Sequence, residues 1–328
     1  MFKEATLADI PAIRAAHGQD DEAGTGLTVF IAEQGCACGV DVRGGGPATR
    51  ETDLLRPENM VQDIHAVVIS GGSAFGLESD CGVANALSEE GIGFKLAGQS
   101  VPIVCGASLF DLAIGEPAWP DIAMGREAAI RALSEGEHLL SCGNVGAGCG
   151  ATVGKMGLPE QAMKSGFAWS GLRLGDIVVI ANVAVNAVGN VMDENGSYLA
   201  GVLGPDGNIM DPLEAAIAAS STRKGASQAP SNSGPAANTT LGVILTNAML
   251  SKAQATKVSQ ITQDAYARCI KPVHSLNDGD TVFTMATREV EADTDLVGMM
   301  ATEAMERAIR KAVRSAEGAF GLKSAKDL

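Results

Sequence analysis

The stretch NTTLGVILTNAMLSK, residues 238–252, carries the strongest signal for the fold. Its apolar run at 240–246 is typical of a buried strand, and the helix that follows begins with a capping box at Ser251. The segment ahead of it, SSTRKGASQAPSNSGPAA (220–237), has the polar, Gly- and Pro-containing composition of a flexible linker. A linker that ends on a small hydroxyl residue at the start of a strand is unusual, because ordinary loops end in turn residues.

The junction between Asn238 and Thr239 has two interpretations. In the first, Thr239 cuts the bond that precedes it, and its new α-amine then acts as the base for its own hydroxyl. In the second, the junction is an ordinary loop-to-strand transition with threonines that favour β structure. Thr240 is the competing nucleophile if cleavage occurs.

The remaining hydrophobic patterns predict alternating strands and helices. Expected strands lie at 27–33 and 37–42 (joined by a turn at Gln34-Gly35), 65–70, 176–187 and 281–286, and expected helices at 73–90, 124–135 and 295–315. Several strand pairs are too close in sequence for crossover helices. We therefore expect mixed sheets covered by helices, a layered α/β sandwich in a single domain of residues 1–328.

Composition and charge restrict the classes of partner. The net charge of −15 argues against nucleic acid and anionic membranes, because phosphate binding needs clustered Lys and Arg. The start MFKEATLADI lacks the features of a signal peptide, and no apolar run has the length of a membrane span. Seven scattered cysteines suggest neither a disulfide framework nor a zinc site. We expect a cytoplasmic protein without metal or cofactor.

Three polar motifs are candidates for chemistry. The run GNVGAGCGATVGK (143–155) fails as a phosphate-binding loop because Cys149 replaces a required glycine, but Lys155 could stabilise an oxyanion. Asp278-Gly279-Asp280 is either a turn or a carboxylate pair that binds a cation, raises the pKa of one partner through like-charge repulsion, or holds an ammonium group. Asn186, among small apolar residues, either satisfies backbone groups or directs its amide at a reacting carbonyl.

Several long phrases, taken in order, resemble the DmpA-type aminopeptidases, which are self-processing hydrolases with an ornithine-acetyltransferase-like fold. This family includes β-aminopeptidases and the nylon-oligomer hydrolase. The phrases are AGTGLTV (23–29), DVRGGGPATRETDLL (41–55), SGGSAFGLE (70–78), GNVGAGCGATVGK (143–155), VNAVGNVMD (185–193), NTTLGVILTNAMLSK (238–252) and PVHSLNDGDTVF (272–283). The resemblance implies a layered αββα sandwich.

The resemblance also implies roles for individual residues. Thr239 would be the nucleophile, freed by cleavage after Asn238 into fragments 1–238 and 239–328. Lys155 matches the lysine of the nylon-oligomer branch, and Asn186 matches the oxyanion-stabilising asparagine. Asp278 and Asp280 match the acidic pair beside the nucleophile's amine. The resemblance further suggests small peptide or amide substrates and a homotetramer of cleaved protomers.

This chain departs from the family pattern in two respects. The β-aminopeptidase branch uses a serine nucleophile and a Ser-x-Glu pair, so its substrate preference does not transfer to a chain with Thr239. An oxyanion tyrosine found in other members has no match, because neither Tyr198 nor Tyr266 lies in a matching phrase. A non-catalytic metabolite-binding protein and an acyltransferase on the same fold remain alternatives.

Overall fold

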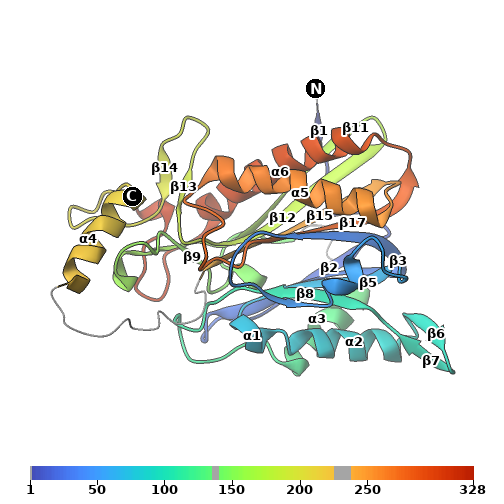
Figure 1. Cartoon of the computed structure of the whole chain (residues 1–328). Helices are drawn as coiled ribbons and strands as arrows, with labels where there is room; N and C mark the ends of the chain where they lie inside the picture. The colour runs from blue at the N-terminus through green and yellow to red at the C-terminus, as the bar shows by residue number, and fades with distance from the viewer. Residues whose placement is uncertain (1, 135–139, 225–237) are drawn as a thin grey trace.

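The strand after the junction lies in the middle of a mixed sheet. The computed structural model describes residues 2–134, 140–224 and 238–328, without the side chains of 221–224. β15 (Thr239–Ala248) pairs antiparallel with β12 (Ile177–Asn186) and parallel with β17 (Thr281–Val290). The sheet has the order β1-β11-β12-β15-β17-β3 (Figure 1), with β1 at Lys3–Glu4, β11 at Phe167–Leu174 and β3 at Thr25–Val42. These positions confirm the strands predicted at 176–187, 240–246 and 281–286.

A second sheet lies below the first and shares strand β3 with it. Its members are β2 (Arg14–Asp20), β3, β5 (Ile64–Ser70), β8 (Val104–Ser108) and β4 (Ala48–Arg50). The first half of β3 pairs with β2 and β5, and its second half pairs with β17. β3 therefore passes from one sheet to the other.

The prediction of two strands joined by a turn at Gln34-Gly35 is wrong in its topology. Gly35 does have the positive φ of a turn residue, at 77°. The chain does not reverse there, because the pairing with β5 only shifts register between Ile31 and Cys36. Such an irregularity bends a strand, and here the bend lets one strand serve both sheets.

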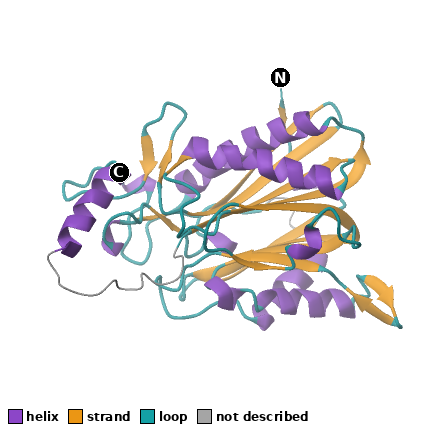
Figure 2. Ribbon diagram, in the orientation of Figure 1, coloured by secondary structure: helices purple, strands orange, loops and turns teal. Residues whose placement is uncertain are grey.

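Helices cover the outer faces of both sheets (Figure 2). α5 (Lys252–Cys269) and α6 (Thr294–Ser315) pack on the first sheet, and α2 (Ser79–Glu89) and α3 (Ile122–Ser134) pack on the second. The capping box at Ser251 is present, with its side chain accepting from the Gln254 amide. The result is the layered α/β sandwich with mixed sheets that the sequence predicts.

The single helix expected at 73–90 is two helices in the structure. α1 (Ser73–Gly76) is separated from α2, and the Ser79 hydroxyl donates to the Gly76 carbonyl at 2.7 Å across the break. Ser73 also has a positive φ of 53°, which is incompatible with a regular right-handed helix start. The prediction of one continuous helix is therefore wrong.

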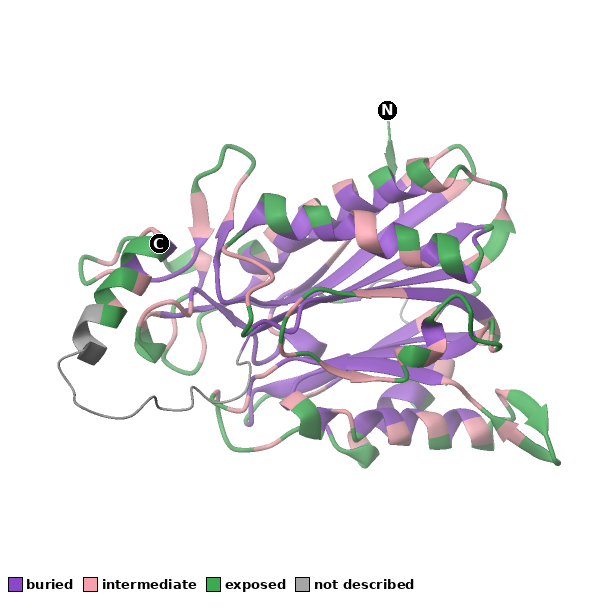
Figure 3. Cartoon of the chain, viewed as in Figure 1, coloured by how far each residue is buried: buried purple, intermediate pink, exposed green. Residues whose placement is uncertain are grey.

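Three apolar clusters fill the three spaces between the four layers (Figure 3). Alternate residues of a strand point to opposite faces, and β15 shows the consequence. Val243 and Leu245 belong to the cluster between the sheets, whereas Ile244 belongs to the cluster under α5 and α6. In the same way, β5 places Val67 between the sheets and Val68 under α2 and α3.

Smaller elements surround the sandwich. The remaining strands are β6 (Phe94–Leu96), β7 (Gln99–Val101), β9 (Thr152–Val153), β10 (Met163–Lys164), β13 (Asn190–Met192), β14 (Tyr198–Ala200) and β16 (Ile270–Lys271). Short 3-10 helices lie at Leu7–Asp9, Asp53–Leu55, Gly146–Gly148, Pro159–Gln161 and Ala325–Asp327. Within 2–134, 140–224 and 238–328, no helix combines the length and apolar character that crossing a membrane needs.

Helix α4 (Pro212–Lys224) changes the boundary of the expected linker. The sequence predicts a flexible segment over 220–237, but residues 220–224 form the end of this helix. The remainder of the expected linker, 225–237, lies outside the described residues.

Candidate active site

The predicted site residues meet at one end of the first sheet. β12 ends at Asn186, and β15 begins at Thr239 directly opposite it in register. β17 begins immediately after Asp278-Gly279-Asp280, and β15 and β17 are parallel neighbours. Three segments that are far apart in sequence therefore place their polar residues together.

The Asn238–Thr239 peptide bond lies in the centre of this group. The Asn238 carbonyl oxygen accepts a hydrogen bond from the Gly279 amide at 2.9 Å and another from the Thr239 hydroxyl. Thr239 is only 3% exposed, and Asn238 forms a parallel bridge with Asp278. A polarised carbonyl beside a hydroxyl is the arrangement from which an acyl shift from nitrogen to oxygen can start.

Lys155 and Asn186 form a hydrogen-bonded pair beside Thr239. The Lys155 ammonium donates to Asn186 Oδ1 at 2.6 Å and to the Asn186 carbonyl at 3.0 Å. Burial lowers the pKa of Lys155 to about 7, although the carboxylates of Asp278 and Asp111 oppose this shift. Lys155 therefore changes its charge near neutral pH.

The amide nitrogen of Asn186 has a different partner from the one that the oxyanion hypothesis assigns to it. Asn186 Nδ2 donates to the Phe110 carbonyl at 2.9 Å. Its Oδ1 accepts from the Thr152 amide at 3.0 Å as well as from Lys155. In the intact chain Asn186 thus holds Lys155 in place, and the Gly279 amide is the backbone donor on the Asn238 carbonyl.

The two aspartates differ in their partners. Asp280 Oδ1 accepts from the Thr240 amide at 2.7 Å, and Oδ2 accepts from the His274 amide at 3.0 Å and contacts His274 Nδ1 at 2.9 Å. Asp278 Oδ2 accepts from the Ser275 amide at 2.9 Å, and the pKa of Asp278 is raised by burial and by the Asp280 charge. Burial and the neighbouring Asp280 both raise the pKa of Asp278, so Asp278 is the carboxyl suited to accept a proton.

His274 and Gly279 are site residues that the sequence does not reveal. His274 joins the site through Asp280, and its φ of 55° is in the left-handed region. Gly279 contributes a backbone amide, which every residue except proline has, so its identity gives no signal. A Cβ atom at position 279 would lie 2.6 Å from the Thr239 hydroxyl oxygen, which explains why this position is glycine.

Thr240 is placed less favourably than Thr239 for cleavage of the chain. It pairs with Val185 in the ladder, and its amide is bound to Asp280. Neighbouring residues of a strand point to opposite faces, and the Thr239 hydroxyl is the one that contacts the Asn238 carbonyl.

The two tyrosines left unmatched in the sequence take no part in binding the Asn238 carbonyl. Tyr198 donates to Asp211 at 2.8 Å, and the buried Tyr266 donates to the Thr281 carbonyl at 3.3 Å. Tyr266 supports the site indirectly, because its ring is stacked near His274 with centroids 6.1 Å apart.

The glycine-rich run has a structural role rather than that of a phosphate loop. Gly146–Gly148 is a 3-10 turn followed by the short strand β9, so no strand–loop–helix unit is formed. The buried ammonium of Lys164 donates to the carbonyls of Ala151 and Ser165, both at 2.9 Å. Lys164 therefore fixes the segment that leads to Lys155.

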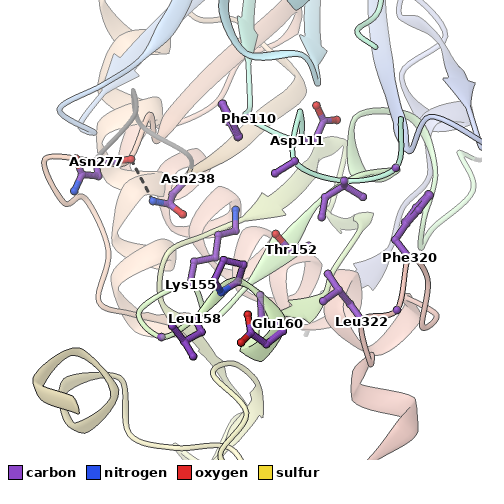
Figure 4. Close-up of a pocket in the computed structure, with 17 residues that line it drawn as sticks. Phe110, Asp111, Thr152, Lys155, Leu158, Glu160, Asn238, Asn277, Phe320 and Leu322 are labelled. Carbon is purple, nitrogen blue, oxygen red and sulfur yellow. Dashed lines mark hydrogen bonds between the residues drawn. The ribbon is translucent and has the colours of Figure 1, made fainter. Parts of the chain in front are cut away.

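A cavity of about 680 Å³ opens beside Asn238 and Lys155 (Figure 4). Its lining includes the apolar residues Phe110, Ile114, Leu158, Phe320 and Leu322. Asp111 also lines the cavity; it accepts from the Thr25 hydroxyl at 2.9 Å and the Gly72 amide at 2.7 Å, and burial raises its pKa to about 6. Over the described ranges, no group of three or more His, Cys, Asp or Glu residues is placed to hold a metal ion.

Several known proteins similar to this chain are peptide or amide hydrolases by name. An uncharacterized aminopeptidase of Mycobacterium leprae (strain TN) is 36% identical, over 97% of this chain and 92% of that protein. The 6-aminohexanoate-oligomer endohydrolase of Kocuria sp. (strain KY2) is 29% identical, over 89% of this chain and 78% of that protein. The structure of the Burkholderia sp. beta-aminopeptidase matches with a TM-score of 0.67 at 18% identity, over 99% of this chain and 92% of that one.

The model of peptidase family S58 matches residues 5–326, almost the whole chain. This match and the relatives confirm the resemblance that the sequence phrases indicate, and they support a peptide or amide hydrolase of the aminopeptidase type. The chain belongs to peptidase family S58.

Proposed function

We propose that this protein is a self-processing amidohydrolase whose nucleophile is Thr239. The observation that carries the proposal is the pair of hydrogen bonds on the Asn238 carbonyl, from the Gly279 amide and from the Thr239 hydroxyl. This arrangement combines a nucleophile with a donor that stabilises developing negative charge on the same carbonyl.

Self-processing would proceed in two steps. Thr239 Oγ1 attacks the Asn238 carbonyl carbon, the carbon–nitrogen bond breaks, and the hydroxyl proton is transferred to the Thr239 nitrogen. Water then hydrolyses the Asn238 ester to a carboxylate and the free Thr239 hydroxyl. The buried carboxylate Asp278, with its raised pKa, is suited to carry the proton because Oδ1 has no hydrogen-bond partner among the described residues.

Fragments 1–238 and 239–328 would remain associated after cleavage. β15 is hydrogen-bonded to β12 on one side and to β17 on the other, and every residue of β15 is buried. Separation of β12 from β15 would expose apolar surface at about 25 cal/mol per Å². Cleavage of one peptide bond at the end of the strand removes none of this burial.

The mature enzyme would then use the Thr239 α-amine as its base. This amine has an ordinary pKa of roughly 7.7–8.0 and must be neutral to accept the hydroxyl proton. The positive charge of Lys155 favours the neutral amine, while Asp278 and Asp280 favour the protonated one. Substrates would be small peptides or amides, cleaved through an acyl-enzyme on Thr239, as the names of the relatives suggest.

Intact-mass spectrometry of the denatured, freshly purified protein tests the proposal. The expected result is two species that correspond to 1–238 and 239–328, with threonine as the first residue of the smaller one. A single full-length mass that persists for days at neutral pH would contradict self-processing. Cleavage before Thr240 would instead identify Thr240 as the nucleophile.

A further inference from the structure

Phe320 has a backbone conformation that aromatic residues rarely adopt. The amides and carbonyls of Ala319 and Leu322 bond to each other at 3.1 and 3.0 Å, which closes a two-residue turn. The central residues, Phe320 and Gly321, both have positive φ, at 53° and 77°. Turns of this kind favour Asn-Gly at these positions, so a phenylalanine there is unfavourable for the backbone. Such strain at the wall of a cavity points to a role for the side chain.

The Phe320 ring lies on the cavity wall (Figure 4). A Cβ atom added to Gly24 would lie 2.7 Å from the ring carbon Cζ and 3.2 Å from Cγ2 of Ile114. The absence of a side chain at Gly24 therefore leaves the space that the Phe320 ring occupies next to Ile114. Phe320 remains 40% exposed, so one part of the ring is available to a ligand.

The cavity lies on the acyl side of the Asn238–Thr239 bond. Asn238 lines it, and Asn238 supplies the acyl group in self-processing. In the mature enzyme a substrate acyl group would be attached to the same Thr239 oxygen. It would therefore extend from the position of Asn238 past Lys155 toward Phe320 and Leu322, which lie on the far side of the cavity in Figure 4.

We propose that the turn at 319–322 forms the acyl-specificity wall of the site, and that Phe320 selects amides whose acyl chain ends in an aromatic or extended apolar group. This inference rests on the proposed function, because it takes the Asn238 side of the cavity as the acyl side. The wall joins residues from both expected fragments: Phe110 and Ile114 belong to 1–238, and Phe320 and Leu322 belong to 239–328.

Binding of three primary amides tests the proposal: acetamide, hexanamide and 4-phenylbutanamide, titrated against the full protein by ligand-observed NMR. We expect 4-phenylbutanamide to bind at least about tenfold more tightly than acetamide. Phe320→Asn should lose about tenfold in affinity for the phenyl amide, because it removes the ring while retaining a residue that tolerates positive φ. Gly24→Ala should also weaken the binding of the phenyl amide, because the added Cβ would displace the Phe320 ring.

Phe94→Asn is the matched control. Phe94 is 39% exposed, almost the same as Phe320, but it lies in the β6–β7 hairpin and does not line the cavity. This variant should bind all three amides as the unaltered protein does. Equal affinity of the unaltered protein for acetamide and 4-phenylbutanamide, including no binding of either, would overturn the proposal. An unchanged affinity of Phe320→Asn for the phenyl amide would also overturn it.

Mass spectrometry of the same samples separates this proposal from the proposed function. Phe320 makes no hydrogen bond to Asn238 or Thr239, so Phe320→Asn should yield the two fragments at an unchanged rate. If the chain never cleaves but prefers the phenyl amide, self-processing would be contradicted, whereas the proposed preference of the 319–322 turn would stand. If the chain cleaves but binds the phenyl amide no better than acetamide, only the proposed role of the 319–322 turn would be contradicted.

Discussion

Strand β15 follows Asn238 and begins with Thr239 and Thr240 at the candidate site, and near its other end it carries Thr246 and Asn247. At that far end the polar atoms are bound to the backbone. The Thr246 hydroxyl donates to the Val178 carbonyl at 2.8 Å, and Asn247 Oδ1 accepts from the Val178 amide at 2.9 Å.

The end of the strand at Thr239 has the same residue types, but several polar atoms around it lack hydrogen-bond partners in the part of the chain that the structure describes. Among the described residues, no hydrogen-bond partner is found for four buried side-chain atoms there: Asn238 Oδ1, Thr240 Oγ1, Asp278 Oδ1 and His274 Nε2. Buried polar atoms are usually satisfied, and exceptions call for an explanation such as a catalytic role. The comparison teaches that hydrogen-bond satisfaction, and not residue type, distinguishes the Thr246 end of β15 from the Thr239 end at the candidate site.

The largest expected effect comes from replacing one threonine at each end of β15. Thr239→Ala should abolish cleavage, leaving one full-length mass, because no other hydroxyl contacts the Asn238 carbonyl among the described residues. Thr246→Ala should cleave at the normal rate and only lose stability, because its hydroxyl bonds backbone groups. Fragments from Thr239→Ala, or an uncleaved but folded Thr246→Ala, would break the distinction between the two ends.

Lys155 gives the next largest effect. Lys155→Met should slow self-cleavage by about 10²–10³, the usual loss for one oxyanion-stabilising donor. Because burial lowers the pKa of Lys155 to about 7, its positive charge is present below pH 7 and lost above it. The rate, followed by mass spectrometry after dilution of denatured protein into buffers of pH 6 to 9, should fall on the alkaline side.

Lys155→Arg serves as the control for charge. A guanidinium keeps its proton throughout this pH range, so the alkaline decline should disappear in a variant that still cleaves. The proposed role of the Lys155 charge would be wrong if the decline persisted in Lys155→Arg, or if Lys155→Met cleaved at the normal rate.

These expectations depend on contacts that the sequence predicts only in part. The strand at 240–246 and the capping box at Ser251 are local patterns, and both are present. The sequence motifs indicate Thr239, Asn186, Lys155, Asp278 and Asp280 as candidates, the family resemblance implies their roles, and the fold brings these residues together. Their individual roles stay predictions.

The rest of the site could not be predicted because it depends on contacts between distant segments. The amide of Gly279 and the carbonyl of Phe110 are backbone groups, which residue identity does not reveal. His274 reaches the site through a left-handed backbone conformation that local propensity disfavours. Similarly, Gly35 looks like a hairpin turn in the sequence, and only its pairing partners show that β3 passes between two sheets.

His274 provides a third test, which asks how strictly the candidate site at the Thr239 end of β15 must be positioned. Its backbone amide and ring both contact Asp280 Oδ2, and a hydrogen bond to a charged group contributes about 1.5–3 kcal/mol. His274→Phe should therefore slow self-cleavage by about tenfold to a hundredfold. His274→Asn should recover most of the rate, since asparagine can donate to Asp280 and tolerates positive φ. Equal rates for the two variants would show that the ring's hydrogen bond is not needed.

The smallest expected difference comes from the two asparagines, compared in a Thr239→Ala background so that both chains stay intact. Asn247→Ala removes the acceptor of the Val178 amide and the donor to the Asp176 carbonyl, at 2.9 Å each. Leaving buried backbone groups unpaired should lower the free energy of unfolding by about 1–3 kcal/mol.

Asn238→Ala removes much less, because Asn238 Oδ1 has no partner among the described residues and Nδ2 reaches the Asn277 carbonyl only at 3.4 Å. The substitution should lower the free energy of unfolding by less than about 1 kcal/mol, since a hydrogen bond of this length contributes little. Urea denaturation midpoints at constant slope measure both values. If Asn238→Ala destabilised the chain as much as Asn247→Ala, the two ends of β15 would not differ in hydrogen-bond satisfaction, and the contrast between them would no longer identify the site.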